Sequence, residues 1–222
     1  KHLEDSVVDP VLRERLRPSY RAACKRLVIS GEFYRAIQHS SAKLVTEPIA
    51  HVEAAGVRTR DGALHGLDVL ALATGFRADR FMRPMHVLGR GGTNLDQLWA
   101  DRPQAYLTVS IPGFPNLFML NGPSSPVGNF SLIDAAEVQL AYIMQLVEQV
   151  RAGRCRELSA STDACARFNA ERCEAAKNTI WSTGCRSWYL DDRGVPTAWP
   201  WSFQHFRDRL RTPDLDALEL VS

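Results

Sequence analysis

The pattern of apolar and polar residues is most regular in the second half of the chain, where it predicts a long amphipathic helix. From Ser131 onward, apolar residues recur every three or four positions, which is the spacing of one helix face. Ser131 followed by Asp134 is typical of a helix start, and Gly153 is a natural end. A second helix is predicted from about Ser161 to Trp181, and a last short helical stretch follows near the C-terminus.

Shorter elements are predicted in the first half. Short helices are expected in VLRERLRPSY, which Pro18 stops, and in GEFYRAIQ, while LVIS and AKLVT are predicted strands. The segment from Ile49 to Phe76 predicts a strand, a hairpin that turns at Asp61-Gly62, and an almost uninterrupted apolar strand. Such a strand is buried on both faces in a parallel sheet, and LFML predicts another buried strand. The pattern therefore predicts an α/β fold.

Composition narrows the classes of partner. With 45% hydrophobic and 23% charged residues over 222 positions, the chain resembles an ordinary globular protein rather than a disordered one. A net charge of +2 is too small to indicate nucleic-acid binding, so a small-molecule partner is predicted. No apolar stretch approaches the roughly 20 residues that a membrane helix needs.

The five cysteines are odd in number and include no CxxC pair. This spacing suggests neither a zinc site nor a complete disulfide framework, and the six histidines lack metal-ligand spacing. We therefore predict no metal, free thiols and a reducing, cytoplasmic location. The chain begins without Met or a signal-like segment, and we expect that it begins inside a longer protein.

Three short motifs are candidates for ligand contact. ALATGF ends in Thr74-Gly75, where a missing side chain allows close approach. NGPSSPVGNFS leads into the N-terminus of the long predicted helix, whose free N–H groups favour partial negative charge. Lys25 and Arg26 precede an apolar run. Because an unpaired charge is costly to bury, they are either solvated or directed at an anionic ligand.

The order of these motifs resembles the C-terminal part of flavin-dependent Baeyer–Villiger monooxygenases, a group of class B flavoprotein monooxygenases. The resemblance covers nearly the whole chain. The motifs that carry it are, in order, CKR, the hairpin, DVLALATGF, F-x-x-P-x-x-V-x-GRGG, PGFPNLFMLNGPSSPVG, E-x-Q-x-x-YI and SWY-x-x-x-x-G with WP. The family's two GxGxxG motifs and its F-x-G-x-x-x-H-x-x-x-W-P fingerprint have no counterpart here. The resemblance thus implies a C-terminal fragment of a flavoprotein with two dinucleotide-binding domains.

The same resemblance implies domain boundaries. Residues 1–20 would end an inserted helical region, residues 21–70 would complete the NADPH-binding domain, and residues 71–222 would form the second half of the FAD-binding domain. The missing N-terminal FAD/NADPH half would be the chain's partner. By itself the fragment is expected to be inactive.

The implied cofactors are FAD and NADPH, and the implied reaction converts a ketone and O₂ to an ester or lactone through a C4a-peroxyflavin. Arg26 would be the catalytic residue beside the flavin, and Lys25 would contact the 2'-phosphate of NADPH. Trp188 would help to close the site, unless it only anchors the tail. The other expected cofactor-binding residues are Ala73, Thr74, Gly75, Asn121, Gly122, Pro123, Val127 and Phe130.

Two alternative functions remain open at this point. One is a related flavin monooxygenase that oxidises nitrogen or sulfur instead of ketones. The fingerprint that would distinguish the two kinds of enzyme is absent from this sequence. The other is a non-catalytic remnant of a truncated gene.

Overall fold

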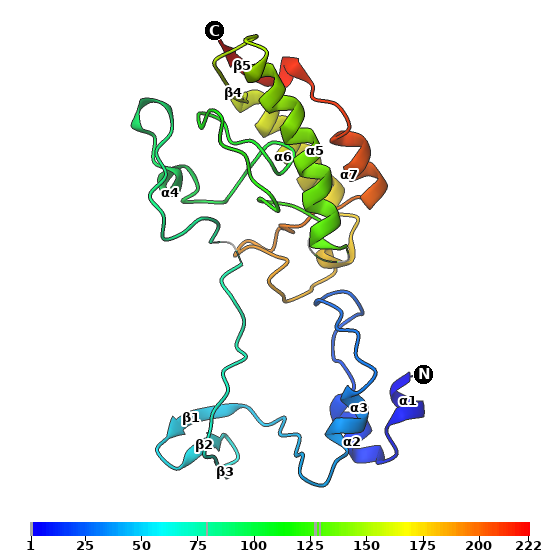
Figure 1. The fold of residues 1–222 in the computed structure, drawn as a ribbon. Helices are drawn as coiled ribbons and strands as arrows, with labels where there is room; N and C mark the ends of the chain where they lie inside the picture. The colour runs from blue at the N-terminus through cyan, green and yellow to red at the C-terminus, as the bar shows by residue number, and fades with distance from the viewer. Residues whose placement is uncertain (1, 79, 127, 129) are drawn as a thin grey trace. The chain divides into compact units, whose positions relative to one another are not determined.

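The chain divides into two compact units in a computed structural model that describes residues 2–78, 80–126, 128 and 130–222 (Figure 1). The smaller unit comprises Lys1–Ser19 and Val28–Phe76, and the larger unit comprises Tyr20–Leu27 and Arg77–Ser222. The short segment that carries Lys25 and Arg26 therefore belongs to the larger unit, although the smaller unit follows it in sequence.

The smaller unit contains three short helices: α1 (His2–Ser6), α2 (Pro10–Leu16) and α3 (Phe33–Ile37). The Asp9 carboxylate accepts a hydrogen bond from the Val11 N–H at 2.9 Å and so caps the start of α2. The helix ends before Pro18, which has no N–H to continue it. The predicted short helices are confirmed.

Three antiparallel strands complete the smaller unit: β1 (Ile49–Glu53), β2 (Gly56–Thr59) and β3 (Leu64–Gly66), in that order in the sheet. The predicted turn between β2 and β3 is confirmed. The Asp61 carboxylate accepts hydrogen bonds from the Thr59 hydroxyl at 2.6 Å and from the Ala63 N–H at 3.1 Å. Gly62 adopts φ of +87°, which a residue without a side chain tolerates best.

Three predicted strands are wrong. LVIS (27–30), AKLVT (42–46) and the apolar run at 67–76 lie in irregular backbone, and Ile29 is fully exposed. A parallel strand needs neighbours to take its backbone hydrogen bonds and helices to cover its faces. Within the described ranges no strand pairs with these segments, and every ladder is antiparallel. LFML forms only an isolated bridge, between Phe118 and Ser110.

The described part of the larger unit combines helices and a two-stranded sheet with long stretches of irregular backbone. Its elements are α4 (Leu95–Leu98), α5 (Leu132–Arg151), β4 (Glu157–Ala160), α6 (Thr162–Ala176), α7 (Phe203–Arg209) and β5 (Leu218–Val221). No helix in the described part of the chain is both long and apolar enough to cross a membrane.

The long helix α5 starts and ends as its sequence predicts. The Ser131 hydroxyl accepts a hydrogen bond from the Asp134 N–H at 3.2 Å, and Gly153 follows the last turn with φ of +69°. Helix α6 is shorter than predicted. It ends at Ala176, whose carbonyl accepts hydrogen bonds from the hydroxyls of Thr179 and Ser182, and a 3-10 turn continues the chain.

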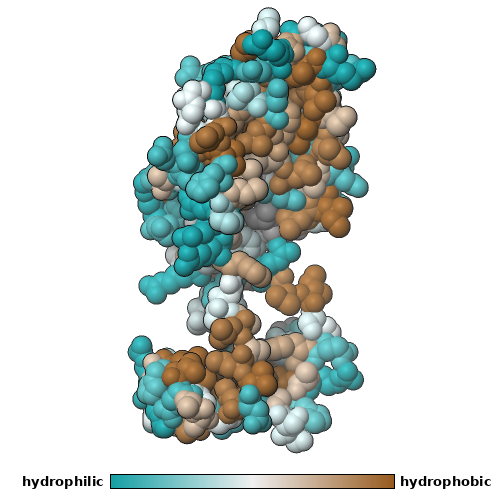
Figure 2. All heavy atoms as spheres, turned by 60° about the vertical axis from the view of Figure 1, so that its left-hand side comes forward, coloured by the Kyte–Doolittle hydropathy of each residue, from teal (hydrophilic) through white to brown (hydrophobic). Residues whose placement is uncertain are grey.

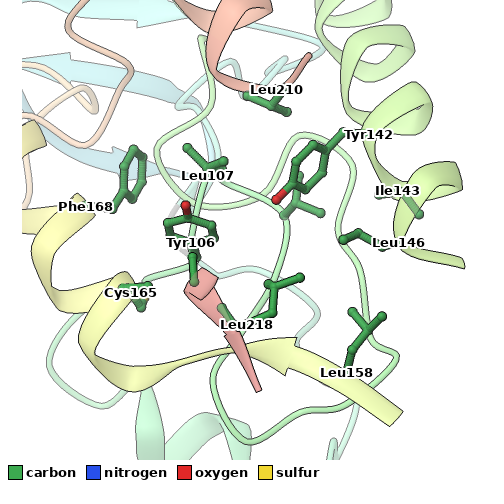
Figure 3. Packing of buried hydrophobic residues seen from close by; sticks show 14 of the residues in the cluster. Tyr106, Leu107, Tyr142, Ile143, Leu146, Leu158, Cys165, Phe168, Leu210 and Leu218 are labelled. Carbon is green, nitrogen blue, oxygen red and sulfur yellow. The ribbon is translucent and has the colours of Figure 1, made fainter. Parts of the chain in front are cut away.

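Packing of α5 and α6 against the β4–β5 sheet forms the main core of the larger unit (Figure 3). Tyr142 and Leu146 from α5, Phe168 from α6, and Leu158 from β4 are almost completely buried in one cluster. At about 25 cal/mol per Å² of apolar surface, burying such side chains is the main force that holds these elements together.

The opposite face of α5 is apolar but exposed. Ile133, Leu140, Met144 and Val147 lie on it at helical spacing, and Ile133 is 72% exposed. Figure 2 shows hydrophobic side chains gathered on the surface of the larger unit. Contiguous apolar surface of this kind is typical of a contact site.

We therefore expect the chain alone to self-associate through α5. Replacing both Ile133 and Met144 by Gln should lower the weight-average mass measured by sedimentation equilibrium, because less apolar surface would be buried between copies. Glu137→Gln is the control, since Glu137 is an exposed polar residue of the same helix. A parent chain that is already monomeric would contradict the prediction.

Candidate functional site

The loop at 121–126 is fixed tightly to its surroundings. A Cβ atom on Gly122 would lie 2.3 Å from the Thr108 carbonyl oxygen, so only glycine fits there. Asn121 adopts φ of +50°, and Pro123 is buried. These three predicted cofactor-binding residues thus share one rigid turn.

The side chain of Gln139 holds this turn against α5. Gln139 is completely buried, and its carbonyl oxygen accepts a hydrogen bond from the Asn121 N–H at 2.7 Å. Its amide nitrogen donates to the Thr108 hydroxyl at 2.6 Å and to the Ser125 hydroxyl at 3.2 Å. The sequence reasoning gave Gln139 no role. The available signal was its place in the E-x-Q-x-x-YI motif, where it is the only polar residue between Glu137 and Tyr142.

Segment 20–27 is joined to the tail of the chain by a disulfide between Cys24 and Cys185, with Cα atoms 5.3 Å apart. The prediction of free thiols is therefore wrong for two of the five cysteines. The two residues are separated by 161 positions, so the fold brings them together and no local spacing could show it. Cys155, Cys165 and Cys173 are free thiols.

Arg26 and Tyr189 meet at one backbone carbonyl. The Arg26 guanidinium donates to the Gly128 carbonyl at 3.5 Å, and the Tyr189 hydroxyl donates to the same oxygen at 3.4 Å. Burial raises the pKa of Tyr189, while the nearby Arg26 charge opposes that rise. The predicted catalytic residue is thus placed beside the loop that contains the predicted cofactor contacts.

The ammonium of Lys25 lies over the ring of Tyr20, 4.5 Å from its centroid. Among the described ion pairs none includes Lys25, and the side chain is exposed. A contact with an aromatic face leaves the ammonium able to bind an anion.

The remaining predicted residues divide between the units. The exposed Trp188 ring packs on Tyr189, with centroids 4.2 Å apart, and Phe130 stacks on Phe203 at 5.2 Å. Val127 lies outside the described residues. In the smaller unit, exposed irregular backbone contains Ala73, Thr74 and Gly75.

A cavity of about 180 Å³ in the larger unit is lined in part by Gly128. Its walls are largely aromatic, and the indole N–H groups of Trp181 and Trp199 are buried without a hydrogen-bond partner in the described structure. The lining residues are Pro126, Gly128, Phe130, Thr179, Ile180, Trp181, Trp199, Pro200 and Trp201. The aromatic walls suit a compact apolar molecule.

Comparison with known proteins shows that the chain is similar to flavin monooxygenases in both sequence and fold. The chain is 31% identical over 226 residues to a Baeyer–Villiger monooxygenase of Pseudomonas aeruginosa, across 100% of the chain and 43% of the relative. It also superimposes on cyclohexanone monooxygenase of Rhodococcus sp. Phi1 bound to NADP+, with a TM-score of 0.86, 28% identity, and 100% and 43% of the two chains covered. Over its whole length the chain is similar to part of these Baeyer–Villiger monooxygenases.

Other relatives agree with this placement. An uncharacterized monooxygenase of Mycobacterium tuberculosis is 49% identical over 196 residues, which are 88% of this chain and 40% of that protein. A steroid monooxygenase bound to NADP matches with a TM-score of 0.85 and 26% identity, over 100% of this chain and 44% of its own. No protein-family model matches the chain. The chain thus spans about two fifths of the length of these monooxygenases.

The buried amide of Gln139 gives a first test of the site. Gln139→Leu should lower the free energy of unfolding by about 1 to 3 kcal/mol, because the Asn121 N–H would be buried without an acceptor. Denaturant unfolding of the protein would measure the change. Gln149→Leu, at a partly exposed position of the same helix, should change stability by no more than about 0.5 kcal/mol. Equal losses in the two variants would contradict the assigned role of Gln139.

Proposed function

We propose that this chain is part of an enzyme that uses FAD, NADPH and O₂ to convert a ketone to an ester or lactone. NADPH supplies two electrons, one oxygen atom enters the product, and the other leaves as water. The observation that carries the proposal is the meeting of Arg26 with the Gly128 carbonyl, at the edge of an aromatic cavity. The match to Baeyer–Villiger monooxygenases over the whole chain supports it.

The residues of the loop fit a flavin. The buried side-chain oxygen of Asn121 has no hydrogen-bond partner in the described structure, and it would accept from an N–H or O–H of a ligand. We assign Asn121, Gly122, Pro123 and Phe130 to the FAD site, within the proposed FAD half at 71–222. When bound, FAD supplies the activation of oxygen.

Arg26 has the charge that this reaction requires. A guanidinium stays protonated at any working pH. It therefore stabilises negative charge that develops on oxygen without neutralising it by proton transfer. The neighbouring Lys25 carries a compact ammonium on a flexible stem, which suits the 2'-phosphate of NADPH. Trp188, exposed on Tyr189, would cover the bound nucleotide.

The first test uses the complete enzyme that contains this chain. Arg26→Ala should lower the rate of ester formation from a ketone by about 100-fold or more, the usual loss when one charge-stabilising donor is removed. Bound FAD, measured from its visible absorbance, should stay unchanged. Arg21→Ala removes an exposed cation of the same segment and is the control. Oxidation of a sulfide but of no tested ketone by the parent enzyme would favour the alternative monooxygenase.

Lys25 is tested through its preference between nucleotides. Lys25→Ala should weaken NADPH binding by about 1 to 3 kcal/mol, the cost of losing a charge-assisted contact. NADH binding should change little, because NADH has no 2'-phosphate. Arg21→Ala again serves as the control. An unchanged preference for NADPH over NADH would show that Lys25 does not contact the phosphate.

The chain by itself should not retain FAD. In this architecture the pyrophosphate is bound by a glycine-rich strand-turn-helix, and this sequence contains no such motif. Gel filtration of the chain mixed with FAD should therefore give a colourless protein peak. Flavin that stays with the peak would contradict this division of the binding site.

A further inference from the structure

The segment that carries Arg26 has little structure of its own. Tyr20–Leu27 contains no helix or strand, and its only internal backbone hydrogen bond among those described runs from the Cys24 N–H to the Arg21 carbonyl. In sequence, Val28–Phe76 of the smaller unit separates it from the rest of the larger unit. Its position on the larger unit therefore depends on side chains.

The disulfide is the covalent link between this segment and the larger unit. Cys24 and Cys185 are packed in a cluster with Trp181, Tyr189 and Ala198. They are only 3% and 7% exposed. This burial shields the sulfur atoms from thiols in solution, so the bond is suited to a permanent attachment rather than to rapid exchange.

Each cysteine of the disulfide is followed closely in sequence by a residue that contacts the Gly128 carbonyl. Arg26 lies two residues after Cys24, and Tyr189 lies four residues after Cys185. Their side chains donate to the one carbonyl of Gly128, which lines the aromatic cavity. The Arg26 contact, at 3.5 Å, is long for a hydrogen bond. The disulfide restrains the backbone two residues before this contact.

We propose that the Cys24–Cys185 disulfide is a positioning clamp for Arg26. It holds the backbone two residues before Arg26 against the Trp181–Tyr189 cluster, and thereby keeps the guanidinium beside Gly128 and the cavity. This inference rests on the proposed role of Arg26. The two cysteines are positioning residues, since neither sulfur needs to touch a substrate.

The first measurement asks whether the bond exists and what it restrains. Peptide mapping of the complete enzyme without reductant should find the Cys24 and Cys185 peptides linked. In the C24S/C185S variant, amide hydrogen exchange in residues 20–27 should become at least about tenfold faster, while the α5 amides stay unchanged. Cys173→Ser, which removes a free thiol, should change neither region. Unlinked peptides, or equal exchange in residues 20–27, would overturn the proposal.

The second measurement asks whether the clamp acts through Arg26. In the complete enzyme, C24S/C185S should lower ester formation about 10- to 100-fold, the loss expected from a misplaced group. NADPH consumption should continue, with more hydrogen peroxide and less ester for each NADPH. A merely structural role would lower both rates together with the amount of folded, FAD-loaded enzyme.

Arg26→Lys makes the test specific, because it keeps the charge and removes the planar guanidinium. If the clamp works by placing that group, C24S/C185S should lower the rate of ester formation much less in the Arg26→Lys background than in the parent enzyme. The fold-losses in rate from the two changes should then not multiply. If the two fold-losses multiply in full, the proposed clamp is wrong, while the proposed role of Arg26 still stands. Wild-type ester formation by Arg26→Ala would instead overturn the proposed function.

A second variant keeps the test decisive if C24S/C185S fails to fold. If C24S/C185S does not fold, C24A/C185A removes the bond without placing hydroxyl groups in the buried cluster. The coupling of NADPH consumption to ester is then compared between this variant and the parent enzyme. Unchanged coupling in the folded, FAD-loaded variant would overturn the proposal.

Discussion

The buried amide of Gln139 is the interaction on which the candidate site depends. One side chain satisfies the Asn121 N–H, the Thr108 hydroxyl and the Ser125 hydroxyl at once, in a place without exposure to water. A buried polar group is tolerated only when its hydrogen bonds are made. The turn at 121–126 is therefore held to α5 by groups that have no alternative partner in water.

This constraint places the rest of the site. Helix α5 is anchored in the main core by Tyr142 and Leu146 (Figure 3), and the turn that it holds leads directly to Gly128. The carbonyl of Gly128 in turn receives Arg26 and Tyr189. A rigid core element thus supports a loop that contacts charged and aromatic groups from two distant parts of the chain.

The two units differ in how much of their apolar surface they bury. In the larger unit, side chains of α5, α6 and the β4–β5 sheet cover one another. The smaller unit leaves the apolar runs at 28–30 and 67–72 exposed. These runs have the composition of buried parallel strands, and a sheet of such strands is stable only with neighbours and covering helices. The sequence pattern thus identified these segments as apolar, but the strands that it predicted there are absent from the described structure.

Short sequence motifs predicted the features of this protein that depend on neighbouring residues. The cap at Ser131, the end of α2 before Pro18 and the turn at Asp61-Gly62 are local hydrogen bonds and backbone preferences, so their short motifs predicted them. The folded structure was needed to reveal the Cys24–Cys185 pairing, the hydrogen bonds of Gln139 and the contact of Arg26 with Gly128. Each of these joins groups that are distant along the chain, and such contacts arise from packing, which local spacing does not encode.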